Sequence, residues 1–478
     1  MPLILGAQSA TTAAAVVSNS CRFNIPDGSE LAATLGTPTD QDTWTCSFWF
    51  KPTSIGEHGV FDAHGDASNY GFYELGTNGQ LTIFQKVGGA TTCVLVTKGL
   101  FLDFSAWYHI VVVWDSGNAT EADRVIVYKN GTRVLAFSTE TYPAQDANSA
   151  MNSAVEHNIG RKDTNDAHNY DGYLAEFVFI DGTVYAASDF GEFDEDSPTI
   201  WKPKKVSGLT FGDNGFYLDF EDSADLGADV SGNSHDFTAT ALTASDQSQD
   251  CPSNNFCIMN ALDDFYPDVA FTDGNNTIVT TNTPYAPTLG TIGLTAGKWY
   301  WETRYDASSG SDWLNGLCGK SPTNATTSLG ASAQDYAYIQ SGGVVHDGSN
   351  TSSGYDALSS GTGILGVYLD IDNSKLYFGV DGTIQNSGTG IDIVALSTLT
   401  IGAWFPAFGD GGAPGNATAS WNFGNGCFGT TAVTSSNTDA NGYGLFEYDP
   451  SDGGSASFDG SAKDFLAICT ENLGSDGG

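Results

Sequence analysis

The alternation of apolar and polar residues is clearest over residues 363–383. From Val367 onward every second residue is apolar, while Tyr368 and Asp370 fall on the opposite face. This period of two is the pattern of a half-buried β-strand. The alternation resumes after a first turn and stops at Asp381-Gly382, a dipeptide suited to a tight hairpin. The stretch therefore predicts an antiparallel meander.

A second stretch with the same organisation lies in the N-terminal half. Residues 107–115 are followed by residues 124–134, and Asn130-Gly131 supplies a turn between short apolar segments. Both faces of Trp107–Trp114 are apolar, which predicts a central strand covered on both sides by packed sheets. The chain is thus expected to contain two β modules in series.

Length and composition support the same organisation. A chain of 478 residues exceeds one ordinary core, and 58 Gly with 20 Tyr and 28 Phe suit many short strands joined by turns. No window shows a sustained 3.6-residue apolar period, so long helices are not expected. We predict an all-β protein with an arm over residues 1–20, a first module over 21–190, a connector over 191–265 and a second module over 266–478.

The charge of the chain argues against two classes of partner. Fifty-seven acidic and 17 basic residues give a net charge of -40, which repels phosphate backbones and anionic lipid. We therefore expect neither nucleic-acid binding nor membrane insertion. The acidity is typical of a soluble, densely displayed protein, with cation binding as the alternative.

The cysteines and the N-terminal arm suggest no special chemistry. The eight cysteines form no CxxC pair, and Cys46 lies at an apolar strand position, so neither a zinc cluster nor a disulfide framework is expected. A bridge between Cys251 and Cys257 is an alternative that we do not favour. Residues 1–20 lack Lys and Arg and are too short and interrupted for a membrane helix, so we expect a retained arm that docks onto another subunit or assembly.

Five motifs stand out in the first module: Trp44–Pro52, Trp107-Tyr108-His109, Tyr128–Gly131, His157–Gly160 and Asp171–Phe177. In these motifs the module resembles the concanavalin A-like, laminin-G-like jelly roll. This resemblance implies a β-sandwich but no single function, because lectins, adhesion modules and glycosidases share that fold.

Four pieces stand out in the second module: Gly297–Thr303, the 363–383 meander, Phe405–Phe408 and Trp421–Gly424. In that order they resemble the SPRY domain, a bent β-sandwich that recognises proteins or peptides. The stretches Phe190–Phe256, Tyr443–Pro450 and Phe465–Leu473 resemble segments of marine bacteriophage virion structural proteins. These resemblances imply a virion protein.

Catalytic groups are not evident in the sequence. Jelly-roll glycosidases need two spaced carboxylates, and the nearest string, Glu192–Asp196, has the wrong spacing and reads as a solvated acidic turn. His109 lies in a buried strand and is expected to be a core residue. His64 and His168, in loops beside Asp66 and Asp166, are candidates for metal or ligand binding. We interpret the protein as non-enzymatic, with no obligatory cofactor.

Calcium is the one ion that the sequence raises. Asp225, Asp229 and Asn233 resemble a turn at the start of laminin-G-like domains and could offer clustered oxygen ligands. The alternative is that these side chains cap turns through hydrogen bonds to the backbone.

Three loops combine an aromatic residue with polar side chains suited to sugar binding. Their candidate ligand-binding residues are Asp66, Asn69 and Tyr70; Asp166, His168 and Tyr170; and Asp312 and Trp313.

These observations lead to one hypothesis and two alternatives. We expect a homo-oligomeric phage protein on the virion surface, in a tail fibre or spike, that contacts other virion proteins and host-surface glycans or proteins with summed avidity. The first alternative is a capsid decoration or head-fibre protein anchored by the arm. The second is a jelly-roll glycosidase.

Overall fold

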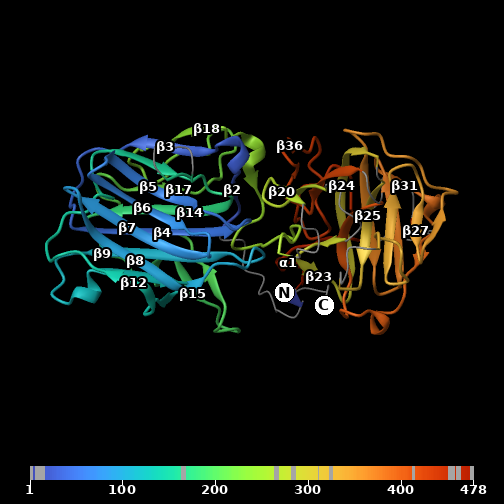
Figure 1. The fold of residues 1–478 in the computed structure, drawn as a ribbon, viewed down its shortest axis with the longest axis horizontal. Coiled ribbons are helices and arrows are strands. Elements are labelled where there is room, and N and C mark those ends of the chain that lie inside the picture. Colours follow the sequence, from blue (N-terminus) through green and yellow to red (C-terminus); the bar gives the residue numbers. More distant parts are fainter. Residues whose placement is uncertain are drawn as a thin grey trace. The chain divides into compact units, whose positions relative to one another are not determined.

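A computed structural model describes the backbone of residues 4–5 and residues 17–162, 168–262, 269–280, 287–310, 312–321, 327–411, 415–450, 458 and 464–473. The chain divides into two compact units, residues 13–253 and residues 254–478 with 1–12. Each is a β-sandwich, and we call them the N-terminal and the C-terminal sandwich (Figure 1). The predicted all-β class is confirmed.

The N-terminal sandwich consists of two eight-stranded sheets. Sheet 1 has the order β11 (Thr132–Arg133), β10 (Val125–Lys129), β9 (Tyr108–Asp115), β4 (Thr43–Pro52), β14 (Gly172–Asp181), β2 (Ser20–Phe23) and β19 (Gln247–Ser248), with β17 (Phe216–Leu218) paired to β14. Sheet 2 has the order β12 (Phe137–Thr141), β8 (Ala90–Leu100), β7 (Gln80–Val87), β6 (Asn69–Leu75), β5 (His58–Asp66), β13 (Glu156–Ile159), β3 (Glu30–Thr34) and β18 (Thr238–Thr240).

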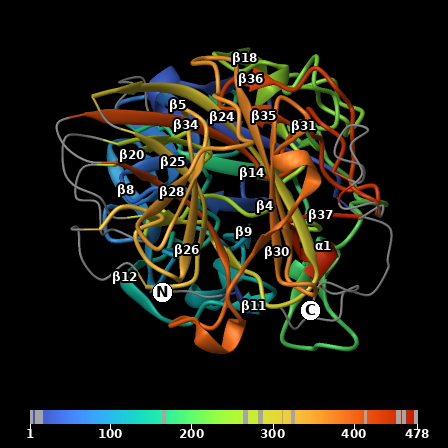
Figure 2. The same cartoon turned by 90° about the vertical axis from the view of Figure 1, so that its right-hand side faces the viewer.

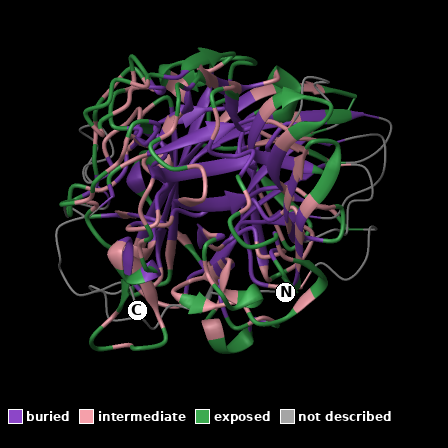
Figure 3. Cartoon of the chain, turned by 90° about the vertical axis from the view of Figure 1, so that its left-hand side faces the viewer, coloured by how far each residue is buried: buried purple, intermediate pink, exposed green. Residues whose placement is uncertain are grey.

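Large aromatic side chains fill the space between sheets 1 and 2. Phe61 of sheet 2 packs 5.1 Å from Phe177 of sheet 1, measured between ring centroids, and Phe48 stacks on the same Phe177 ring at 5.1 Å. Strand β9 lies between β10 and β4, as its apolar faces predicted. In Figure 3 the buried strands of this sandwich lie behind exposed loops.

The stretch expected as a connector packs largely with the first module. Strands β17, β18 and β19 pair with β14, β3 and β2, so residues 191–253 belong to the N-terminal sandwich and the division of the chain falls after Ser253. A two-stranded ribbon of β15 (Gly191–Phe193) and β16 (Trp201–Pro203) belongs to the same unit.

The C-terminal sandwich consists of a nine-stranded and a six-stranded sheet, which face the viewer in Figure 2. Sheet 3 has the order β20 (Ala270–Thr272), β21 (Thr277–Val279), β34 (Asn416–Asn422), β24 (Lys298–Ser309), β29 (Ile364–Asp370), β30 (Lys375–Val380) and β31 (Thr383–Ile384), with β32 (Ile391–Asp392) on β30 and β37 (Leu466–Ala467) on β24. Sheet 4 has the order β22 (Thr288–Leu289), β33 (Phe405–Asp410), β25 (Trp313–Cys318), β26 (Asp335–Ile339), β27 (Val344–His346) and β28 (Ser349–Thr351).

Short elements complete the fold. The pairs β35 (Cys427–Phe428) with β36 (Thr431–Ala432) and β1 (Ile4–Leu5) with β23 (Ile292–Gly293) form two small ribbons, and α1 covers Thr470–Leu473. Single 3-10 turns occur at Ile25–Asp27, Glu121–Asp123, Ala187–Asp189, Ala244–Asp246, Asn386–Gly388 and Leu396–Thr398. Over the described ranges, the helices are all too short to span a lipid bilayer.

The predicted meander is present, with one difference. Strands β29, β30 and β31 pair antiparallel, and Asp381 and Gly382 adopt φ angles of 47° and 78° at the second turn. The expected open face is closed, however, because Tyr368 and Asp370 are both buried. A second cluster of apolar side chains from the C-terminal segment covers this face.

Candidate functional site

The outer face of sheet 2 carries a group of aromatic side chains. Tyr70 and Phe72 of β6 point away from the core because their neighbour Tyr73 points into it. Phe84 of β7 lies opposite Phe72 in register, with the two rings stacked 4.8 Å apart. The Tyr70 ring lies 5.5 Å from Phe84 and 5.9 Å from His64 of β5. We call His64, Tyr70, Phe72 and Phe84 the aromatic face.

Two lysines flank the aromatic face. The Lys162 ammonium lies 4.1 Å from the centre of the Phe72 ring, and the Lys86 ammonium lies 5.5 Å from that of Tyr70. Phe72 is therefore largely covered, whereas Tyr70 and Phe84 remain half-exposed. Contiguous apolar side chains left in contact with water are typical of a binding surface.

The predicted polar partners of Tyr70 lie at the edge of the same face. The Asn69 amide donates to both carboxylate oxygens of Asp66 at 3.2 Å, and its own oxygen accepts from the Gly88 amide at 2.9 Å. The Ser68 backbone N–H and the Asn69 amide hold the pKa of Asp66 below its ordinary value. Asp66 and Asn69 are exposed, so the turn presents fixed hydrogen-bonding groups beside an aromatic ring.

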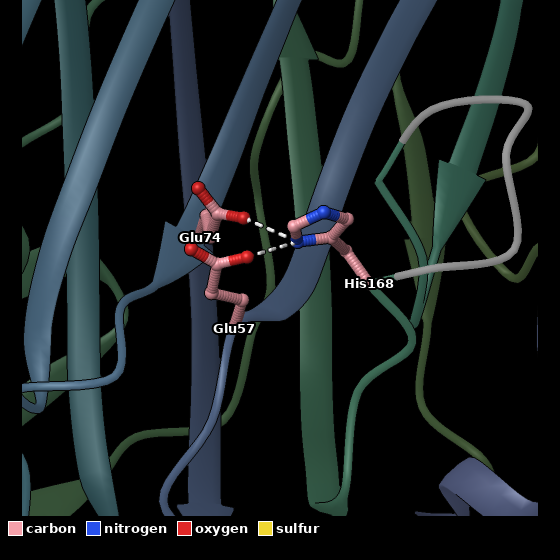
Figure 4. A group of neighbouring side chains, drawn as sticks. All are labelled: Glu57, Glu74 and His168. Carbon is pink, nitrogen blue, oxygen red and sulfur yellow. Dashed lines mark ion pairs between the residues drawn. The ribbon is translucent and has the colours of Figure 1, made fainter.

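A cluster of titratable side chains lies on the same sandwich (Figure 4). Glu57 precedes β5, Glu74 lies on β6 and His168 precedes β14. The Nδ1 atom of His168 is 2.9 Å from Glu74 Oε1 and 3.3 Å from Glu57 Oε2. Lys162 Nζ also contacts Glu74 Oε1, at 2.8 Å. Asp166, the predicted partner of His168, lies outside the described residues.

Two predicted aromatic platforms are packing residues instead. Tyr170 is fully buried in the N-terminal core, where its hydroxyl donates to the Tyr173 carbonyl at 3.3 Å. Trp313 is fully buried in the C-terminal core, 5.9 Å from Phe408. Asp312 is exposed and accepts from Gln340 at 3.2 Å. Asp312 precedes β25 and is exposed, whereas Trp313, the first residue of that strand, is buried, so the two do not present one surface.

The calcium candidates hold a turn together. Asp229 accepts hydrogen bonds from the backbone N–H groups of Tyr217, Ser231 and His235, each at 2.9 Å. Asp225 accepts from the Gly227 N–H at 3.2 Å, while Asn233 donates its amide to the carbonyls of Gly212 and Gly215. This geometry matches the capping alternative, since the carboxylate oxygens already accept from the backbone.

The acidic string Glu192–Asp196 also has structural partners. Glu192 lies on β15, and Asp194, just after that strand, accepts from the backbone N–H groups of Asp196 and Ser197 at 3.0 and 2.9 Å, so it caps the acidic turn that follows.

His109 is a core residue, as predicted. Its Nε2 lies 2.9 Å from Ser47 Oγ, and its Nδ1 accepts from the Trp201 indole at 3.0 Å. Burial lowers the pKa of His109 to about 3. Both ring nitrogens are therefore occupied by neighbours inside the protein.

All eight cysteines are buried. The absence of a disulfide framework and of a Cys251–Cys257 bridge stays a prediction.

A protein-family model matches the part of the chain that carries the aromatic face. Residues 26–188 match the model of the concanavalin A-like lectin/glucanases superfamily. The expected jelly roll is confirmed for the first module. No curated protein matches the chain in sequence.

Several solved structures are similar to the chain, among them a pentraxin, a laminin domain pair and a SPRY domain. The heptameric SAP-like pentraxin from Limulus polyphemus is 14% identical with a TM-score of 0.29, covering 36% of this chain and 80% of the pentraxin. Domains LG4-5 of the mouse laminin alpha1 chain are 12% identical with a TM-score of 0.30, covering 87% of each chain. The SPRY domain of human HERC1 is 12% identical with a TM-score of 0.23, covering 30% of this chain and 87% of that domain.

Sequence reasoning found part of this surface and missed the rest. It identified Tyr70 from its polar neighbours but did not connect it with Phe72 and Phe84. The signal was available, because Phe72 and Phe84 alternate with core residues on adjacent strands. The pairing of Glu57 and Glu74 with His168 had no local signal, since the three residues come from separate elements.

Proposed function

We propose that the protein is a non-enzymatic recognition protein that binds glycans on the aromatic face of sheet 2. The observation that carries the proposal is the cluster of Tyr70, Phe84 and His64 left half-exposed on a regular sheet. The flat, weakly polar faces of sugar rings stack on aromatic side chains, and neighbouring carboxylate, amide and ammonium groups can bond to their hydroxyls. Asp66, Asn69 and Lys86 are such neighbours.

We further propose that the protein is displayed on a bacteriophage virion, in a tail fibre or spike, as a homo-oligomer. Support comes from the resemblance of residues 190–256, 443–450 and 465–473 to marine phage virion proteins, and from a net charge of -40, which disfavours partners with phosphate backbones. Several copies on one particle would let weak glycan contacts sum to useful avidity.

The binding proposal is tested with a glycan array and titration calorimetry on the purified full-length chain. Tyr70→Ala and Phe84→Ala should each weaken binding about tenfold or more, which corresponds to about 1.4 kcal/mol. Phe193→Ala is the matched control, because Phe193 is an exposed phenylalanine at 44% of its maximal accessibility on the β15–β16 ribbon of the same unit. Loss of binding in Phe193→Ala, with both other variants unaffected, would place the site elsewhere.

The phage assignment is tested on particles. Immunogold labelling with antibodies to the purified chain should mark the tail tips of purified virions. Labelling in a regular pattern over the head would instead favour the capsid decoration alternative. The non-enzymatic assignment is tested by measuring reducing sugar released from bound glycans, where release abolished by Glu192→Gln would contradict it.

A further inference from the structure

We propose that Glu57, Glu74 and His168 form a binding site for a divalent transition-metal ion of the zinc class. The three residues offer one ligand atom each, and these atoms lie within 4.8 Å of one another. Zinc ligands sit about 2.0–2.2 Å from the ion, so two ligands in a tetrahedron are about 3.3–3.6 Å apart. The separations of 2.9 and 3.3 Å between Nδ1 and the two carboxylates are close to that spacing.

The imidazole is held in place for this role. The His168 carbonyl accepts from the N–H groups of Gly59 at 2.8 Å and Lys162 at 3.2 Å, which fixes its backbone. Gly59 permits this approach, because a Cβ atom there would lie 2.2 Å from the Lys162 nitrogen. Within the described part of the chain, the buried Nδ1 atom has no hydrogen-bond partner of suitable geometry. Figure 4 shows both carboxylates directed at this nitrogen.

Charge also favours a cation here. Two carboxylates lie within 3.3 Å of the imidazole Nδ1, and the ammonium of Lys162 contacts the cluster through Glu74. Lys162 also lies over the Phe72 ring at 4.1 Å, so its ammonium can leave the carboxylate and keep that second contact. A divalent metal ion would then face the two carboxylates with a charge of +2, in place of the single positive charge of the Lys162 ammonium.

The donor set indicates which ions fit. Imidazole nitrogen with carboxylate oxygen suits Zn²⁺ and its neighbours, whereas Ca²⁺ takes six to eight oxygen ligands. Three protein ligands leave a fourth position for water or for an oxygen atom of a bound molecule. The inference goes beyond glycan binding and does not depend on it, because the metal alone is the probe.

The first experiment measures Zn²⁺ binding by the full-length chain after treatment with a chelator. Titration calorimetry should show one ion per chain, and His168→Ala and Glu74→Gln should each weaken binding about 100-fold. Glu57→Gln, at a side chain that is 56% exposed, gives a variant that keeps the fold and should also lose affinity. His235→Ala is the matched control, since His235 lies in the same sandwich with its Nε2 on the Asp213 carbonyl.

The second experiment separates a metal site from a plain ion-pair cluster. Lys162→Gln removes the competing ammonium, so Zn²⁺ should bind severalfold more tightly. Co²⁺ added to the chelator-treated chain should give visible absorption bands that His168→Ala abolishes and His235→Ala retains. Equal Zn²⁺ affinity in the wild type and in His168→Ala, or no measurable binding in both the wild type and Lys162→Gln, would overturn the proposal.

Discussion

The outer faces of sheets 2 and 3 both carry paired aromatic side chains, but those on sheet 3 are buried and those on sheet 2 are partly in contact with water. On sheet 3, Tyr300, Tyr368 and Tyr377 lie opposite one another across β24, β29 and β30. On sheet 2, Phe72 and Phe84 are paired in the same way across β6 and β7. Yet the three tyrosines are buried, at 2% exposure or less, whereas Phe84 remains half-exposed.

The difference comes from a covering segment in the C-terminal sandwich. Phe446, Phe458 and Phe465 pack on the tyrosines, with ring centroids 5.1 Å apart for Tyr300–Phe446 and 5.2 Å apart for Tyr368–Phe465. A row of aromatic side chains on the outer face of a sheet therefore forms a second hydrophobic core when another segment of the same chain packs apolar side chains on it. Without that cover, it becomes a surface available to a ligand.

Glu302 fastens this cover to the sheet. One carboxylate oxygen accepts from the Tyr448 N–H at 2.7 Å and the Tyr300 hydroxyl at 2.9 Å. The other accepts from the Glu447 N–H at 3.0 Å and the Asn422 amide at 2.9 Å. A buried carboxylate that accepts four hydrogen bonds ties the segment around Tyr448 to β24 and β34.

The largest predicted effect is the loss of the cover. Phe465→Ala should reduce the free energy of unfolding by about 3–5 kcal/mol, because it leaves a cavity under a fully buried ring. Phe84→Ala should cost about 1 kcal/mol or less, since its ring already contacts water. Denaturant unfolding gives both values, and hydrogen exchange at the β29 and β30 amides assigns the first to the C-terminal sandwich. Equal losses of unfolding free energy in Phe465→Ala and Phe84→Ala would contradict the distinction between a covered face on sheet 3 and an open face on sheet 2.

Local patterns in the sequence predicted much of the strand pairing. Asp381-Gly382 and Asn130-Gly131 both form turns with positive φ, as their residue types require. The apolar faces of Trp107–Trp114 placed β9 inside its sheet. These features depend on residues close together in the chain, so the pattern contains the information.

Burial of the second faces could not be predicted in the same way. The alternation predicted an open face at Tyr368 because the cover of this side chain comes from Phe458 and Phe465, far along the chain. The partners of His168 are likewise distant from it in sequence. The burial of Trp313 also depends on a distant residue, because its ring packs on Phe408 of β33.

The second prediction concerns pH. Burial raises the pKa of Glu302 to about 7 from its ordinary 4.5, although its four hydrogen-bond donors act in the opposite direction. A raised pKa means that the folded state holds the proton more tightly than the unfolded state. The contribution to stability is therefore complete below pH 4.5 and is lost as the pH rises through 7, by about 3 kcal/mol.

Glu302→Gln tests this assignment. The variant has no proton to lose at this position, so the fall in stability of the C-terminal sandwich between pH 4.5 and 7 should flatten. The NH₂ group of the introduced glutamine would face two hydrogen-bond donors, so the substitution should reduce the free energy of unfolding by about 1–3 kcal/mol at low pH. Denaturant midpoints measured at several pH values, with exchange at the β24 amides, give both quantities. An unchanged slope would assign the pH dependence to other groups.

The smallest predicted effect concerns Lys86, whose ammonium lies over Tyr70 and donates to the Ala67 carbonyl at 3.0 Å. On a face open to solvent, Lys86→Gln should change the free energy of unfolding by only about 0.5 kcal/mol, because exposed cation–π contacts are weak. If a second copy of the chain covered the aromatic face in a homo-oligomer, the same change would cost more, and the cost would depend on protein concentration. Unfolding measured over a wide range of concentrations distinguishes the two cases. A large, concentration-dependent loss would mean that this face, like that of sheet 3, is covered, with the cover supplied by another subunit instead of by the chain itself.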